Sequence, residues 1–431
     1  MSTAISARAR SLSEGLPRAS RLDVIDKLFV LSAFVAGINL SLFQALTAYD
    51  VMIAVLAFMI AAGPRRMQLP PPYVILASFV FVAAALLSLF RALYPIEAVT
   101  QMLQFAFVFW VQIPVVLTIV RSRRILHAAV IAFIAGSAVS MIVAAVLGED
   151  GGANRLATYY TDNANALGFP VAFLTPFLLY YVVTNWRRHG PTFSLIATAG
   201  LAYLFLWILS ASASRAAAAA TITGILVFVM LRGGRVAWRR LPVRLVASAL
   251  CLVGAGFAIF NTGVFSSRLE ERVVATVNPT VGSVTDQRTS LNRGGLNAFA
   301  ESPLVGVGLN NFRHVSQFHD DAGTFHDPHN LWVQFLAQIG LFGTLAFLAL
   351  VVTWFMTLYR AQARAVARTD LELCWAFIAA MAAILMFHMA SPIMIQRHVW
   401  LVFALGLACA QVVAGQSRSR RVGTTPAGPS A

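Results

Sequence analysis

The sequence predicts an all-α polytopic membrane protein with about 12 transmembrane helices. Of its 431 residues, 59% are hydrophobic and only 11% are charged, whereas soluble globular proteins carry about 25% charged residues. The hydrophobic residues form long segments, and the charges fall in short runs between them. A chain of this length has room for two or three soluble domains, but its composition argues against that arrangement.

The net charge of +15 is carried mostly by arginine, because Lys27 is the only lysine. Basic proteins often bind nucleic acid, but that activity usually needs basic clusters on a water-exposed face. Here the arginines separate apolar segments instead. The three cysteines, Cys251, Cys374 and Cys409, lie inside apolar segments, which argues against disulfides and thiolate metal sites.

A helix needs about 20 predominantly apolar residues to cross the hydrocarbon core of a membrane. Twelve segments of the chain meet this requirement, and the first two run together near residues 45–50. The segments are residues 27–46, 47–63, 72–90, 98–120, 125–147, 165–185, 192–211, 214–231, 243–262, 330–359, 372–391 and 397–414. Residues 1–26 lack the pattern of a signal peptide, so they are predicted to form a cytoplasmic N-terminal tail.

The arginines predict how these helices are oriented, because positively charged residues resist translocation. With the N-terminus inside, most of the 32 basic residues fall in cytoplasmic segments, and each such segment carries at least two arginines. An odd number of helices would break this alternation. We therefore predict both termini in the cytoplasm, with helices one to nine in residues 27–262, helices ten to twelve in residues 330–414, and a C-terminal tail in residues 415–431.

Residues 263–329 form a predicted outer loop that is far longer than the usual helix–helix connection of 2–8 residues. Such a loop is more often a functional module than a simple connection. We expect it to contain helices of its own, for example around Arg288–Ala300.

Arg215 is the first candidate functional residue, since a charge beside a spanning helix is costly and usually has a function. It follows Ser-Ala-Ser-Ala-Ser at the outer start of the eighth segment and precedes five alanines. These small residues predict close helix packing, which would direct the guanidinium into the mouth of the bundle. The alternative is an arginine that extends to the membrane surface.

Arg288 and Arg293 are the next candidates, in the loop sequence Asp-Gln-Arg-Thr-Ser-Leu-Asn-Arg-Gly-Gly. The planar fork of a guanidinium matches the oxygens of a phosphate. Two arginines from separate elements can therefore hold a diphosphate without a metal. For either loop arginine taken alone, a solvated side chain is the simpler interpretation.

His329 is the candidate base. Asp327 is predicted to be a helix N-cap and Pro328 the first helical residue, which places His329 in the first turn. The positive end of the helix dipole disfavours imidazolium, and a neutral histidine can act as a general base near pH 7. Three turns later, Gly340 would share the face of His329, and Gly343 with it would permit a close neighbour. The alternative is an interfacial histidine with no chemical role.

A metal site is a competing interpretation of the same region. Seven potential ligands crowd a short stretch: His314, His319, Asp320, Asp321, His326, Asp327 and His329. Histidine and aspartate are plausible ligands for zinc or manganese. Their spacing matches no standard metal signature, so no metal is predicted.

Three stretches of the chain resemble the O-antigen ligase family of the ligase/polymerase superfamily. His329-Asn330, followed after nine residues by Gly340-Leu341-Phe342-Gly343, is similar to the ligase pattern of His, then Asn, Ser or Gln, nine residues and Gly-x-x-Gly. Ser212-Ala213-Ser214-Arg215 is similar to the Ser-x-Ser-Arg helix start of the family, and residues 301–312 are similar to its Pro-Leu-x-Gly-x-Gly-x-x-Asn-Phe stretch. The resemblance covers about residues 25–415.

The resemblance implies an inverting glycosyltransferase of the bacterial inner membrane that acts in lipopolysaccharide biosynthesis, with its active site facing the periplasm. Its donor would be O-antigen on undecaprenyl diphosphate and its acceptor lipid A–core. No cofactor is expected: no metal, ATP or nucleotide sugar. Arg215 and Arg288 would hold the diphosphate, His329 would take the acceptor proton, and Arg293, Asn330, Gly340 and Gly343 would contribute to substrate binding.

Three other activities remain open on the sequence. An O-antigen polymerase uses the same carrier but a second carrier-linked glycan as acceptor, and a protein O-oligosaccharyltransferase uses a serine hydroxyl. The spacing from His-Asn to Gly-x-x-Gly favours the ligase over both. A transporter or flippase of lipid-linked glycan would place charges near mid-membrane, whereas the candidate residues here gather at the outer edge.

Overall fold

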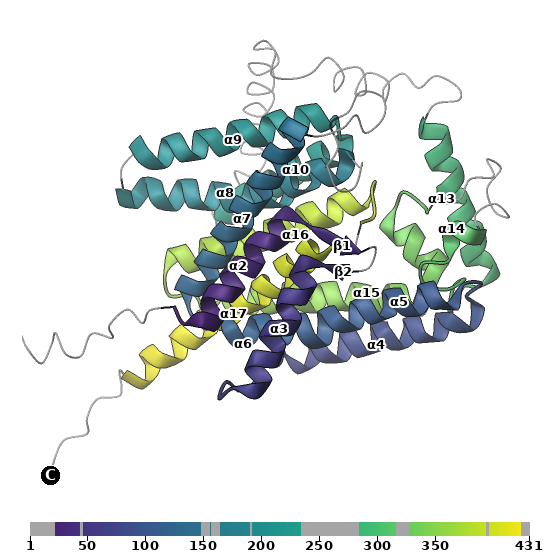
Figure 1. Ribbon diagram of the computed structural model, residues 1–431, viewed down its shortest axis with the longest axis horizontal. Coiled ribbons are helices and arrows are strands. Elements are labelled where there is room, and N and C mark those ends of the chain that lie inside the picture. The colour runs from purple at the N-terminus through teal and green to yellow at the C-terminus, as the bar shows by residue number, and fades with distance from the viewer. Residues whose placement is uncertain are drawn as a thin grey trace, which may run out of the picture.

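The computed structural model describes residues 22–43, 46–147, 156, 164–189, 192–233, 284–315, 327–393 and 396–423. Side chains are described in these ranges except for residues 185–189, 192–198, 284–288 and 417–423. The described chain is mostly helical, as the composition predicts (Figure 1). The predicted span 243–262 and the start of the predicted outer loop lie outside the described residues.

The first part of the chain forms helices of 7 to 25 residues. They are α2 (Val24–Ile38), α3 (Ala48–Ala62), α4 (Pro72–Ser88), α5 (Pro95–Phe107), α6 (Ile113–Ile119) and α7 (Arg123–Leu147). A 3-10 turn, η1 (Leu89–Arg91), follows α4, and a π-helical turn, η2 (Val108–Gln112), joins α5 to α6 in one continuous rod. Each predicted span in this part therefore contains a helix.

The second part of the chain contains the longest helix. Its helices are α8 (Ala164–His189), α9 (Thr192–Ser212), α10 (Arg215–Arg232), α13 (Val284–Glu301), α14 (Phe312–Val315), α15 (Leu331–Gln362), α16 (Arg368–His388) and α17 (Arg397–Gly423). Within the described residues, 8 helices are long and apolar enough to cross a membrane. The chain is thus a multi-pass membrane protein, while the count of twelve and the cytoplasmic termini remain predictions.

The predicted span 27–46 is wrong at its C-terminal end. Helix α2 stops at Ile38, because Asn39 takes the left-handed conformation (φ 59°) that ends many helices and donates its N–H to the Val35 carbonyl. A short antiparallel hairpin of β1 (Ser41–Phe43) and β2 (Leu46–Thr47) follows. Thr47 and Asp50 then form a capping box that starts α3. Polar capping residues therefore set the boundary that hydropathy alone could not locate.

Helices far apart in the sequence pack side by side. Figure 1 shows α4 and α5 alongside α15, with α8, α9 and α10 grouped on the other side of the molecule. Phe81 of α4 contacts Phe105 and Phe109 of the α5–η2 rod and Phe335 and Phe347 of α15. This aromatic cluster fixes the position of α15, which begins two residues after the candidate base His329.

The two ends of the bundle differ in charge. At one end Arg232 and Arg368 both bind the buried Glu372, at 3.3 and 3.1 Å, and Arg123 pairs with Asp370. We call this the arginine-rich end. The opposite end, which we call the loop end, carries α13 and α14 beside the starts of α5 and α15 (Figure 1). Which of these two ends faces the cytoplasm remains a prediction.

Candidate active site

Helix α15 is broken at Gly340, which has φ 63° and ψ −166° inside an otherwise helical segment. Only glycine adopts this conformation readily. A Cβ on Gly340 would lie 2.3 Å from the carbonyl carbon of Leu304, so no side chain fits there. The prediction that Gly340 shares the helix face of His329 is therefore wrong, because it assumed a continuous helix. The close neighbour that Gly340 permits is the backbone of a loop.

That loop, residues 303–308, is bonded to both sides of the break. It comes from the Pro-Leu-x-Gly-x-Gly stretch, and its partners are residues 337–342 of α15. The backbone hydrogen bonds run from Val307 to Ala337 (2.8 Å), Gly308 to Gln338 (3.0 Å), Leu341 to Pro303 (2.8 Å) and Phe342 to Leu304 (3.3 Å), with the donor N–H named first in each. The loop thus satisfies carbonyls and N–H groups that the broken helix leaves without partners.

The N-cap of α15 is Asn330, not Asp327 as predicted. The Asn330 Oδ1 accepts from the N–H groups of Trp332 (3.0 Å) and Val333 (3.4 Å), and the helix begins at Leu331. His329 is therefore half-buried in the segment just before the helix rather than in its first turn. It remains next to the positive end of the helix dipole.

Asp327 is engaged elsewhere, which explains why it does not cap the helix. Its Oδ1 accepts a hydrogen bond from Gln338 Nε2 at 2.9 Å. Loss of solvent raises the pKa of the Asp327 carboxyl above its ordinary value. The Oε1 of the same Gln338 accepts from the Asn310 N–H at 3.1 Å. One buried amide thus joins the segment before His329, the first half of α15 and the loop that precedes α14.

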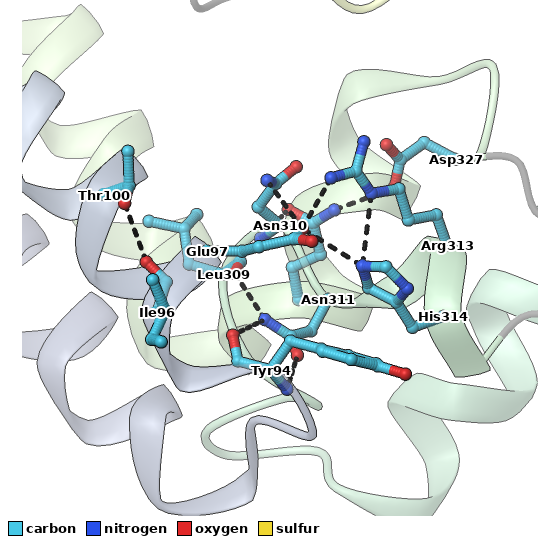
Figure 2. A network of polar contacts seen from close by, with 11 residues as sticks. Tyr94, Ile96, Glu97, Thr100, Leu309, Asn310, Asn311, Arg313, His314 and Asp327 are labelled. Atoms are coloured by element: carbon cyan, nitrogen blue, oxygen red, sulfur yellow. Dashed lines mark hydrogen bonds and ion pairs between the residues drawn. The ribbon is translucent and has the colours of Figure 1, made fainter. Parts of the chain in front are cut away.

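Glu97, in the first turn of α5, gathers three donors from the loop side (Figure 2). Its Oε2 accepts from Arg313 Nη2 at 2.5 Å and from Asn310 Nδ2 at 3.4 Å, and lies 3.0 Å from His314 Nε2. No motif in the sequence points to Glu97 or Arg313 as functional residues. The one sequence signal was an acidic residue two positions after Pro95, which marks a helix start but not its partner.

Asn311 holds the same loop against Tyr94, the residue just before α5 (Figure 2). Its Oδ1 accepts from the Tyr94 N–H at 2.6 Å, and its Nδ2 donates to the carbonyls of Tyr94 (3.2 Å) and Leu309 (3.0 Å). The Leu309 N–H in turn donates to Ser88 Oγ at 3.1 Å. The Asn-Phe part of the sequence motif is therefore structural: it fixes the loop that holds α15.

Arg215 is the first residue of α10. The preceding Ser214 caps the helix, since its Oγ accepts from the Ala217 N–H at 3.3 Å and donates to Asn165 Oδ1 of α8 at 2.9 Å. Ala217 and Ala220 are fully buried where α10 packs against α8 and α16. The small residues around Arg215 thus allow close helix packing, and Arg215 itself is half-buried.

Helix α13 presses directly on the start of α15. A Cβ on Gly295 would lie 2.6 Å from Val333 Cγ1 and 3.0 Å from Pro328 Cγ. Arg288 precedes Gly295 by two helical turns and therefore lies on the same face of α13; its side chain is outside the described residues. Arg293 lies on another face and is exposed.

Arg215 lies at the same end of the bundle as His329. Helices α10 and α16 are antiparallel, because Arg232 pairs with Glu372 at the arginine-rich end and Gly224 faces Ala383 further along. The start of α10 is therefore near the end of α16. There Trp332 Nε1 of α15 donates to Met389 Sδ at 3.1 Å. The starts of α10 and α15, with α13 packed on the latter, thus lie at the same end of the bundle, the loop end.

Residues 199–348 match the family model described as O-antigen ligase. This match supports a relationship of the segment to the O-antigen ligase superfamily. The match runs from α9 to the middle of α15, so it contains Arg215, α13, the loop and the Gly340 break. No curated protein matches the chain.

The matched family suggests a glycosyltransferase-like enzyme of the ligase/polymerase type, and the match does not separate ligase from polymerase. The matched segment also gives Asn330, Gly340 and Gly343 structural positions: the first caps α15, the second breaks it, and the third is buried one turn later. Their part in substrate binding stays a prediction, as do the catalytic roles of Arg215, Arg288 and His329.

The potential metal ligands of this region are partly described. His314 lies beside Glu97, and Asp327 binds Gln338. His319, Asp320, Asp321 and His326 lie outside the described residues. Within the ranges that the structure covers, no three His, Cys, Asp or Glu side chains are grouped as metal ligands would be.

Proposed function

We propose that the chain is an O-antigen ligase. It transfers O-antigen polysaccharide from undecaprenyl diphosphate to lipid A–core at the periplasmic face of the bacterial inner membrane. The observation that supports the proposal is that three elements lie at the same end of the bundle: the start of α10 with Arg215, helix α13 with Arg288, and the segment before α15 with His329.

The reaction is a single displacement. His329 accepts the proton of the acceptor hydroxyl as its oxygen bonds to the anomeric carbon of the donor. The bond between that carbon and the diphosphate oxygen breaks, and undecaprenyl diphosphate leaves with the electron pair. Attack opposite to the leaving group inverts the anomeric centre.

Arg215 and Arg288 stabilise the leaving diphosphate. Its negative charge grows in the transition state, and guanidinium groups offer charge-assisted, two-pronged hydrogen bonds to phosphate oxygens. Arg293 assists from the exposed side of α13. Asn330, Gly340 and Gly343 contribute to substrate binding by shaping the segment that carries His329, while Gln338 and Asp327 keep that segment against the loop.

Transfer with defined acceptors tests the proposal. Purified protein receives undecaprenyl-diphosphate-linked glycan together with lipid A–core, a second carrier-linked glycan or a serine-containing peptide. We expect transfer to lipid A–core alone, without an energy source and in the presence of EDTA. Transfer to the second glycan instead would make the protein a polymerase, and transfer to the peptide a protein O-oligosaccharyltransferase.

The polymerase is the second candidate, because the superfamily match covers both types of enzyme. A deletion strain separates the two activities. Loss of a ligase leaves lipid A–core without O-antigen while polymer accumulates on the carrier. Loss of a polymerase leaves core that carries a single repeat unit.

A further inference from the structure

A pocket of about 640 Å³ lies at the arginine-rich end, opposite the candidate active site. The segment before α4, the last turns of α15 and the last part of α17 form its walls. Its polar lining residues include Gln68, Tyr73, Arg360, Arg364 and Gln411. Nothing in the proposed transfer reaction uses it.

The charges around this pocket favour an anion. Arg360 and Arg364 are four residues apart, hence on one face of the chain at the end of α15, where like charges repel each other. Among the described residues that line the pocket, none is acidic. The negative end of the α15 dipole would by itself favour an arginine there. The wall opposite α15 also carries partial positive charge, which the dipole of α15 does not explain. That wall holds the N-terminus of α4, which starts at Pro72 without a side-chain cap.

The pocket is held in shape by its own residues. The Arg360 guanidinium carbon lies 5.6 Å from the centre of the Tyr73 ring, a cation–π contact that fixes its direction. The Tyr73 hydroxyl is hydrogen-bonded to Thr357 Oγ1 at 3.0 Å, and Gln411 Nε2 donates to Gln68 Oε1. Three consecutive prolines, residues 70–72, stiffen the rim. A bound anion therefore meets side chains that are already oriented.

The surroundings of the pocket indicate that the anion is attached to a lipid. Leu69 on its rim is 66% exposed, and Tyr359 and Met356, beside Arg360 on α15, are 67% and 41% exposed. Met356 and Tyr359 lie on α15, which is long and apolar enough to cross a membrane, and Leu69 lies in the segment just before α4. Exposed apolar side chains at such positions would face acyl chains. The arginines lie where those chains meet the head groups. Basic pockets between spanning helices on the cytoplasmic side bind anionic head groups.

We propose that this pocket binds the phosphodiester head group of an anionic phospholipid of the inner leaflet. The Arg360 and Arg364 forks hold the phosphate oxygens, and the acyl chains lie along Leu69, Met356 and Tyr359. The site is independent of glycan transfer, and it anchors α4, α15 and α17 to one lipid molecule.

Native mass spectrometry of the purified full-length protein in detergent tests this site, with phosphatidylglycerol and phosphatidylcholine as probes. The test variant is the double substitution Arg360→Gln/Arg364→Gln. The control, Arg66→Gln/Arg124→Gln, removes two exposed arginines from the same end outside the pocket. We expect the test variant to bind phosphatidylglycerol roughly thirtyfold more weakly than wild type. The control should bind it as wild type does, and phosphatidylcholine should bind all three proteins equally.

Two results overturn the proposal. Equal phosphatidylglycerol binding by wild type and the test variant would remove the pocket as the site. Binding of free glycerol phosphate as strong as that of the lipid would assign the pocket to a soluble anion. Thermal unfolding without lipid verifies that the variants fold. Should the double variant not fold, Arg364→Gln alone is measured, with an expected loss of roughly fivefold and the same overturning results.

Discussion

At the scale of single residues, Gly340 is the position where an added methyl group should lower stability most. Its backbone angles are reached almost only by glycine, and a Cβ would meet the Leu304 backbone. We expect Gly340→Ala to lower the free energy of unfolding by at least about 2 kcal/mol. The control is Gly200→Ala in α9, where a Cβ meets nothing within 4 Å; it should be neutral. Thermal unfolding in detergent measures both variants. Equal melting temperatures for Gly340→Ala and Gly200→Ala would show that a side chain at Gly340 causes no backbone strain.

His329 should matter for transfer and little for stability. It is half-buried and lies outside the helix that Asn330 caps, so His329→Ala should abolish glycan transfer and leave the melting temperature nearly unchanged. As a control for stability, Asn330→Asp preserves a capping oxygen and should also keep the melting temperature. Full transfer activity by well-folded His329→Ala protein would rule the imidazole out as the base.

Some residues of the site follow from the sequence and others do not. His329 and Arg215 stand next to helix starts, which capping residues reveal. The cap itself was misplaced because aspartate and asparagine cap equally well, and only the contact between Asp327 and Gln338 decides between Asp327 and Asn330. Glu97 could not be found at all, since 216 residues separate it from Arg313.

At the scale of elements, the contact between the loop that precedes α14 and the first half of α15 is stabilised more by buried hydrogen bonds than by charge. Gln338 is 1% exposed and binds both Asp327 and Asn310. Gln338→Leu should therefore cost about 1–3 kcal/mol, because it leaves buried partners unsatisfied, and should slow transfer. Glu97→Gln breaks a pair whose side chains are 33% and 41% exposed, so it should cost less than about 1 kcal/mol. A larger loss of unfolding free energy for Glu97→Gln than for Gln338→Leu would contradict the claim that burial matters more than charge at this contact.

A buried ion pair joins α3 to α17. Arg397 Nε donates to Asp50 Oδ1 at 2.6 Å, and the two side chains are only 6% and 3% exposed. Removal of one partner leaves an uncompensated charge, so Arg397→Gln should cost about 3–5 kcal/mol. The double variant Asp50→Asn/Arg397→Gln should recover part of that loss while keeping the Thr47 cap. A double variant no more stable than Arg397→Gln would show that the charge of Asp50 is not the cause.

Hydropathy located the helices but not their interruptions. Spans such as 72–90 and 125–147 lie within a few residues of α4 and α7, since an apolar run of that length has few other uses. The end of α2 and the break in α15 depend on single residues, Asn39 and Gly340. Asparagine and glycine also occur inside helices, so neither residue alone marks an interruption. At Gly340 the break is bonded to the backbone of residues 303–308, a distant segment that no local pattern records.

At the scale of the whole molecule, the separation of charge predicts which end faces which compartment. Ile96 at the loop end is 83% exposed, and Val366 at the arginine-rich end is 52% exposed. In a background with alanine at Cys251, Cys374 and Cys409, we expect a membrane-impermeant maleimide to label Ile96→Cys on intact spheroplasts. It should label Val366→Cys only after lysis. The opposite pattern would reverse the orientation and place the candidate active site in the cytoplasm.

The sequence points to the O-antigen ligase superfamily, because its motifs between Ser212 and Gly343 lie within the segment that matches the family model. It does not separate ligase from polymerase. Both enzymes need cations for the same diphosphate and a base for an acceptor hydroxyl, so their motifs reflect shared chemistry. The acceptor is recognised by surfaces that these motifs do not include.

The paired backbones of residues 303–308 and 337–342 have a consequence for protein engineering. A graft that moves only one of these two segments into a relative would pair it with a backbone whose hydrogen-bonding groups are not arranged to match it. Residues 303–342 therefore form the smallest unit that can be exchanged between such enzymes, and recombination junctions should be sought on either side of it.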